Sequence, residues 1–125
     1  MMKKILIIED EASLRMALFE KFSGEGFEVL TADNGEDGLA LAVESVPNLI
    51  LLDIILPKMN GFEVLNQLSK NDLTKDIDVM ILTNLSEAGK VGDIVRRGVS
   101  DYLIKADWTL EELSEKVKNK LRESN

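Results

Sequence analysis

The sequence predicts an α/β domain with a five-stranded, doubly wound parallel sheet and five helices. Three observations favour this fold class: short apolar runs recur, segments of helical apolar spacing separate them, and glycine or proline stands at several junctions. Because strand–helix–strand crossovers are right-handed, such an alternation packs as a parallel sheet with helices on both faces. The 125 residues, 45% of them hydrophobic, suffice for one domain over residues 1–125.

The expected strands are short and rich in branched apolar residues. Residues 5–8, 49–52 and 79–82 are continuous apolar runs followed by polar residues, which is typical of parallel strands buried on both faces. Residues 27–31 and 100–104 are weaker candidates of the same kind.

The expected helices lie between these runs. Their apolar side chains recur every three or four residues, which is the spacing of one helix face. The pattern covers residues 14–22, 39–46, 62–68, 91–95 and 110–121.

The junctions agree with these boundaries. Gly24 follows the first helical pattern, Pro47 separates the second from its strand, and Gly98 follows the fourth. Thr109 and Glu112 have capping-box spacing at the start of the last helix. We therefore expect strand and helix to alternate five times.

The composition narrows the chemistry. Twenty-three acidic residues against 15 basic ones give a net charge of −8, which opposes direct binding of nucleic acid. Cysteine and histidine are absent, so disulfides, thiolate metal sites and an imidazole base are excluded. The N-terminal apolar run of residues 5–8 is too short for a signal peptide or membrane insertion, so we expect a soluble cytoplasmic protein.

Polar residues follow the expected strands at the edge where an open parallel sheet binds its ligands. They are Glu9, Asp10, Asp53, Thr83 and Lys105. Each alone has an ordinary explanation as a helix cap, turn or surface residue, but together the carboxylates would repel one another without a cation. Three carboxylates without histidine or cysteine suit Mg²⁺, and a carboxylate can also act as a nucleophile toward phosphorus.

Four segments in order, KILIIEDE, LILLDIILPKMNGFEVL, MILTN and DYLIK, resemble response-regulator receiver domains of two-component phosphorelays. The chemotaxis response regulator is a single-domain example of this family. The resemblance extends over essentially the whole chain and implies the flavodoxin-like strand order 2-1-3-4-5. It also implies that Asp53 is the phosphoacceptor and that Mg²⁺ or Mn²⁺ is bound by Asp53, Asp10, Glu9 and the backbone carbonyl of Ile55.

The resemblance further implies a switch. Lys105 would pair with the phosphoryl group, Thr83 would move to bond it, and Tyr102 would turn inward, altering the surface of the fourth helix, fifth strand and fifth helix. Ile55 and Leu85 occupy positions whose side chains in the family help or hinder attack by water on the phosphoryl group; both are apolar, so we expect slow autodephosphorylation. The resemblance implies Mg²⁺-dependent self-phosphorylation from a donor, and we do not expect a turnover enzyme.

The same resemblance implies partners. Because the chain has no histidine, the phosphoryl donor would be a histidine kinase or a histidine phosphotransfer protein. The output would be a downstream protein effector or an output domain missing from this chain.

One departure from the family leaves an alternative open. Ala106 follows Lys105 where proline is common, so we expect a trans peptide or a reshaped loop, and residues 106–109 form a connection about one residue longer than usual. A receiver-like interaction module acting without phosphorylation is therefore the main alternative.

Two other functions fit the sequence less well. A dehalogenase-like phosphatase would carry a second aspartate at the position of Ile55. A nucleotide or flavin binder would need a phosphate-cradling loop after the first strand, where this chain has acidic residues.

Overall fold

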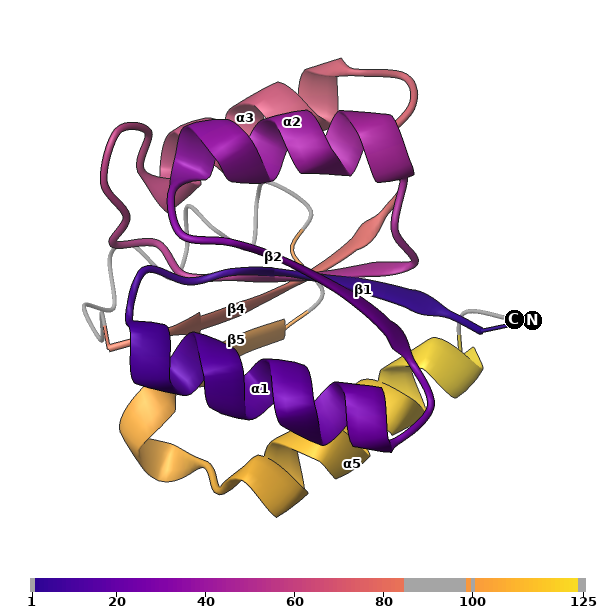
Figure 1. Ribbon diagram of the computed structural model, residues 1–125. Coiled ribbons are helices and arrows are strands. Elements are labelled where there is room, and N and C mark those ends of the chain that lie inside the picture. Colours follow the sequence, from indigo (N-terminus) through magenta and orange to yellow (C-terminus); the bar gives the residue numbers. More distant parts are fainter. Residues whose placement is uncertain (1, 85–98, 100, 124–125) are drawn as a thin grey trace.

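The computed structural model describes residues 2–84, 99 and 101–123, in which strands and helices alternate along the chain (Figure 1). The elements are β1 (Lys4–Ile8), α1 (Ala12–Gly24), β2 (Glu28–Ala32), α2 (Gly35–Ser45), β3 (Leu49–Leu52), α3 (Gly61–Lys70), β4 (Asp78–Thr83), β5 (Asp101–Ile104), the 3₁₀ turn η1 (Lys105–Asp107) and α5 (Leu110–Glu123). The helix expected over residues 91–95 lies outside the described residues. Among the helices described, none has the length and apolar character needed to cross a membrane.

The sheet has five parallel strands in the order β2-β1-β3-β4-β5, which confirms the expected fold class and order. In the strand register, Ile8 lies opposite Leu52, and Thr83 lies opposite Ile104. The carboxyl ends of these strands therefore meet at one edge of the sheet, as the sequence predicts for the site.

Helices cover both faces of the sheet. Figure 1 shows α2 and α3 on one side and α1 and α5 on the other. Successive strand residues face opposite sides, so Ile5 and Ile7 pack toward α1 and α5, whereas Leu6 and Ile8 pack toward α2 and α3. All four are at most 1% exposed, which explains why this strand reads as an unbroken apolar run.

Local hydrogen bonds explain where the helices begin. The side chain of Asn34 accepts a bond from the N–H of Asp37 at the start of α2 (2.8 Å). At α5, the Thr109 hydroxyl accepts from the Glu112 N–H (3.1 Å), and the Glu112 carboxylate accepts from the Thr109 N–H (2.9 Å). The expected capping box is thus confirmed.

Candidate functional site

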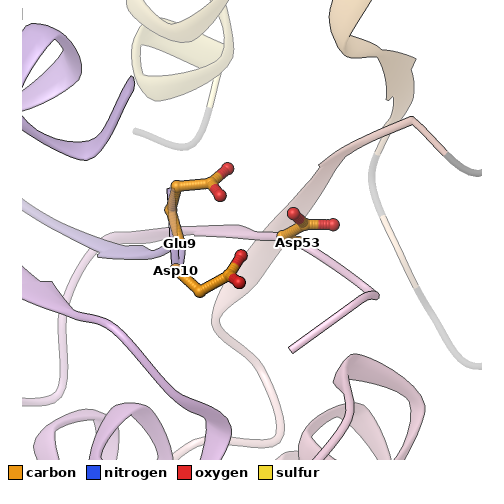
Figure 2. Close-up of side chains that lie close together, drawn as sticks. All are labelled: Glu9, Asp10 and Asp53. Atoms are coloured by element: carbon orange, nitrogen blue, oxygen red, sulfur yellow. The ribbon is translucent and has the colours of Figure 1, made fainter. Parts of the chain in front are cut away.

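Three carboxylates gather at the carboxyl edge of the sheet. Glu9 follows β1 directly, Asp10 lies in the turn to α1, and Asp53 follows β3. One carboxylate oxygen of each lies within 4.8 Å of the others, and Figure 2 shows Glu9 and Asp10 extending from the end of β1 toward Asp53. Glu9 is 2% exposed and Asp53 5%, whereas Asp10 is exposed, so the cluster has a buried floor and an open side.

Lys105 joins two of these acids. Its ammonium lies 2.7 Å from Glu9 Oε1 and 2.8 Å from Asp53 Oδ2, and its side chain is only 12% exposed. Lys105 begins η1 directly after β5, and the structure has no cis peptide among the described residues, so the bond to Ala106 is trans as expected. The 3₁₀ turn η1 thus contains Ala106, the residue that stands where proline is common in the family.

Burial sets the electrostatics of this pair. It raises the pKa of Glu9 above its usual value, because loss of solvation outweighs the hydrogen bonds from Lys105 and from the Glu11 N–H. Burial alone would lower the pKa of Lys105, but its bonds to Asp53 and Glu9 outweigh that effect and raise it. The cluster thus holds three carboxylates and one ammonium, which is paired with Glu9 and Asp53, so the site stays electronegative and receptive to a cation.

The Asp53 carboxylate is held at both oxygens. Oδ1 accepts a hydrogen bond from the backbone N–H of Ile55 (3.1 Å), and Oδ2 accepts one from Lys105 (2.8 Å). The main chain of Asp53 is anchored through its N–H to the carbonyl of Ile8 on β1 (3.0 Å). The side chain is thus oriented before any ligand arrives.

The donor set fits a hard divalent cation. The side chains of the cluster offer carboxylate oxygens, and oxygens are the ligands that Mg²⁺ and Mn²⁺ prefer. The exposed side of the cluster at Asp10 leaves room for water and phosphate oxygens, which Mg²⁺ usually keeps among its ligands.

The structure brings Glu9, Asp10, Asp53 and Lys105 together and places the other expected residues around them. Thr83 is the last residue of β4, fully buried at the same edge of the sheet. Tyr102 lies within β5 opposite Ile81 and is half-buried against the core on the α2 and α3 side. Leu85 lies outside the described residues.

Sequence reasoning missed Arg15. Its guanidinium Nη1 donates to the backbone carbonyl oxygens of Glu9 (3.0 Å) and Asp10 (3.3 Å), in the turn that carries both acids. Helical side chains point toward the helix N-terminus, so a cation in the first turns after such acids is the signal that could have revealed it. The contact of Lys105 with Glu9 was missed as well.

Comparison with known proteins agrees with this arrangement. Residues 5–118 match the model of the response regulator receiver domain family. "Probable transcriptional regulator ycf27" of Porphyra purpurea is 33% identical over 123 residues, covering 98% of this chain and 49% of that protein. "Protein PilH" of Pseudomonas aeruginosa is 40% identical over 105 residues, covering 83% of this chain and 86% of that protein. The chain thus spans about half the length of the first of these relatives and most of the second.

Solved structures show the same likeness. A CheY-like response regulator receiver domain protein from Methanospirillum hungatei superposes with a TM-score of 0.91 at 30% identity, covering 98% of this chain and 96% of that chain. The match over residues 5–118 and the likeness of the two structures lead to one assignment. The chain belongs to the response regulator receiver domain family.

Proposed function

We propose that this chain is a phosphorylation-activated signalling switch that accepts a phosphoryl group on Asp53. The observation that carries the proposal is the position of the Asp53 carboxylate, which is nearly buried, held at both oxygens, and adjacent to two further carboxylates and one ammonium. Such a site combines an oriented oxygen nucleophile with charges suited to a phosphoryl group.

The proposed reaction is transfer from a phosphohistidine. An Asp53 oxygen attacks phosphorus, the O–P bond forms, and the N–P bond breaks with its electron pair remaining on the imidazole nitrogen of the donor. Lys105, freed from part of its bonding to Asp53, offsets the negative charge on the transferred group. The N–H of Ile55 holds the second Asp53 oxygen in place.

The metal would be held by Asp53 and Asp10, with Glu9 acting through water and the Ile55 carbonyl as a further ligand. When bound, Mg²⁺ supplies positive charge that neutralises the phosphate oxygens. Glu9 lies against Lys105, so its share in the metal site is indirect.

The proposed output rests on Thr83 and Tyr102. Thr83, buried at the end of β4, is suited to bond a phosphoryl oxygen, and Tyr102 would follow that movement from β5. The altered surface would include β5 and α5 and would control a protein partner. The donor would be a histidine kinase or phosphotransfer protein, and the net charge of −8 argues against direct contact with nucleic acid.

Incubation with Mg²⁺ and acetyl phosphate tests this proposal directly. Intact mass should show one added phosphoryl group on the parent chain, none on Asp53→Asn, and none when the metal is chelated. No adduct on the parent, together with failure to bind beryllofluoride, would instead favour an interaction module that works without phosphorylation.

The phosphorylated state should be long-lived because of Ile55. Its side chain is apolar, 56% exposed and two residues from Asp53, so it cannot orient water for attack on the phosphoryl group. We expect Ile55→Asn to shorten the lifetime of the acyl phosphate several-fold, measured by intact mass after removal of the donor. Leu73→Asn, at a 58% exposed leucine in the connection between α3 and β4, away from the site, should leave the lifetime unchanged. Equal decay in both variants would count against this role for Ile55.

A further inference from the structure

Arg15 donates to main-chain oxygens although acidic side chains lie near it. It lines an open cleft of about 440 Å³ together with three acids, Asp33, Asp37 and Glu44. Among the described residues it forms no ion pair with any of them, and its guanidinium instead donates to two main-chain oxygens. Asp33 and Asp37 are bonded to the Asn34 amide (2.7 and 2.9 Å). The position of the Arg15 head group is therefore determined by the turn between β1 and α1.

The two carbonyls belong to the peptide groups on either side of the Asp10 α-carbon. The Glu9 carbonyl lies in the plane that precedes Asp10, and the Asp10 carbonyl lies in the plane that follows it. Because peptide groups are planar, a donor that holds both oxygens restrains both backbone dihedrals of Asp10 and hence the direction of its Cα–Cβ bond.

Asp10 depends on this restraint more than its neighbours do. Glu9 is held by Lys105 and by the Glu11 N–H, and Asp53 is held by Lys105 and the Ile55 N–H. The Asp10 carboxylate is exposed and has no hydrogen bond or ion pair within the described part of the chain. The direction in which the Asp10 side chain leaves the main chain, toward Asp53 in Figure 2, is thus set by the backbone.

We infer that Arg15 is a positioning residue for the metal site, acting through the backbone of the turn to aim Asp10 at the cation. The inference rests on the proposed function, since it concerns the same site. Arg15 bonds the main chain and none of the three carboxylate side chains, so its role is to hold geometry. Groups that orient metal ligands in this way commonly change metal affinity by tenfold or more when removed.

Charge and geometry predict opposite results, which makes the inference testable. If Arg15 acted only as a nearby positive charge, Arg15→Met would make the site more negative and would tighten cation binding. If Arg15 positions Asp10, the same variant would weaken binding despite the lost positive charge. The sign of the change separates the two explanations.

The experiment measures Mn²⁺ affinity by counting free ion with electron paramagnetic resonance. We expect Arg15→Met to raise the dissociation constant about tenfold. Arg15→Lys keeps the charge but replaces the planar guanidinium with a single ammonium on a shorter side chain, so its dissociation constant should lie between those of the parent and Arg15→Met. Arg122→Met is the matched control, because Arg122 is exposed in the last turn of α5. This turn lies at the edge of the sheet opposite the site, since the carbonyl of the neighbouring Leu121 accepts a hydrogen bond from Lys3, which precedes β1. Arg122→Met should leave the affinity unchanged.

Thermal unfolding in chelator checks that each variant is folded and distinguishes structural loss from loss of metal affinity. Unchanged or tighter Mn²⁺ binding by Arg15→Met, or an Arg15→Lys that binds no better than Arg15→Met, would overturn the inference while leaving the proposed function intact. A parent chain that binds no Mn²⁺ would overturn both the metal site of the proposed function and this role for Arg15.

Discussion

Lys105→Met is expected to lower the free energy of unfolding of the metal-free protein by about 3 kcal/mol at pH 7. The ammonium is the shared partner of Glu9 and Asp53, at 2.7 and 2.8 Å, and all three side chains are nearly buried. Its removal leaves carboxylates facing one another with no compensating charge, which is far costlier than losing an exposed pair. Denaturant unfolding in chelator measures the change.

The loss of unfolding free energy in Lys105→Met should be larger at higher pH. Burial already raises the pKa of Glu9, and loss of Lys105 removes the contacts that counter this rise. A carboxyl group whose pKa is higher in the folded state binds more protons there, so stability falls as the pH rises above the group's ordinary value of 4.5. The variant should therefore lie closer to the parent at pH 5 than at pH 7. In the parent, the raised pKa of Lys105 contributes stability that is lost only above its ordinary value of 10.5.

Two controls bracket this result. Lys75→Met removes an exposed lysine from a pair with Asp72 and should change stability by less than about 1 kcal/mol. Asp10→Asn removes one of the mutually repelling carboxylates and should stabilise the metal-free protein. Adding Mg²⁺ should reduce the difference in unfolding free energy between Lys105→Met and the parent. Equal stability of Lys105→Met and the parent in chelator at pH 7 would contradict the role assigned to the lysine.

The layout of the fold could be predicted because it depends on patterns that repeat along the chain. Residues 5–8 and 49–52 are apolar at every position, and both prove to be central strands buried on both faces. The helical periods between the strands and the Thr109 capping box depend on neighbours within a few residues. The strand order came from the family resemblance, since local patterns do not say which strands pair.

The sequence predicts which residues lie at the site, because they follow strands, but it does not predict which of them bond one another. Glu9, Asp53 and Lys105 follow their strands directly, so a parallel sheet brings them to one edge. Which oxygen the ammonium bonds depends on the path of η1, and the bond from Arg15 depends on the angle at which α1 leaves the turn. Neither is encoded in spacing alone.

Gly61→Ala is expected to lower the free energy of unfolding by about 2–3 kcal/mol and to weaken metal binding. Gly61 begins α3, and its N–H donates to the carbonyl of Ile54 (2.8 Å) in the segment that follows Asp53. A β-carbon on Gly61 would lie 2.5 Å from the α-carbon of Ile54 and 2.6 Å from the carbonyl oxygen of Asp53. Both are backbone atoms, so the strain cannot be relieved by rotating a side chain, and the chain around Asp53 must shift.

Gly24→Ala provides the matched comparison, because Gly24 ends α1 and a β-carbon there would meet nothing within 4 Å. Alanine is the better helix former by roughly 1 kcal/mol in a helix interior, so this variant should be as stable as the parent or slightly more stable, with unchanged Mn²⁺ affinity. Opposite signs for the same substitution would show that contact with the Asp53 segment, and not helix propensity, requires glycine at 61. If Gly61→Ala unfolds and binds Mn²⁺ as Gly24→Ala does, the segment after Asp53 moves without cost, and the close packing of α3 does not hold Asp53 in place.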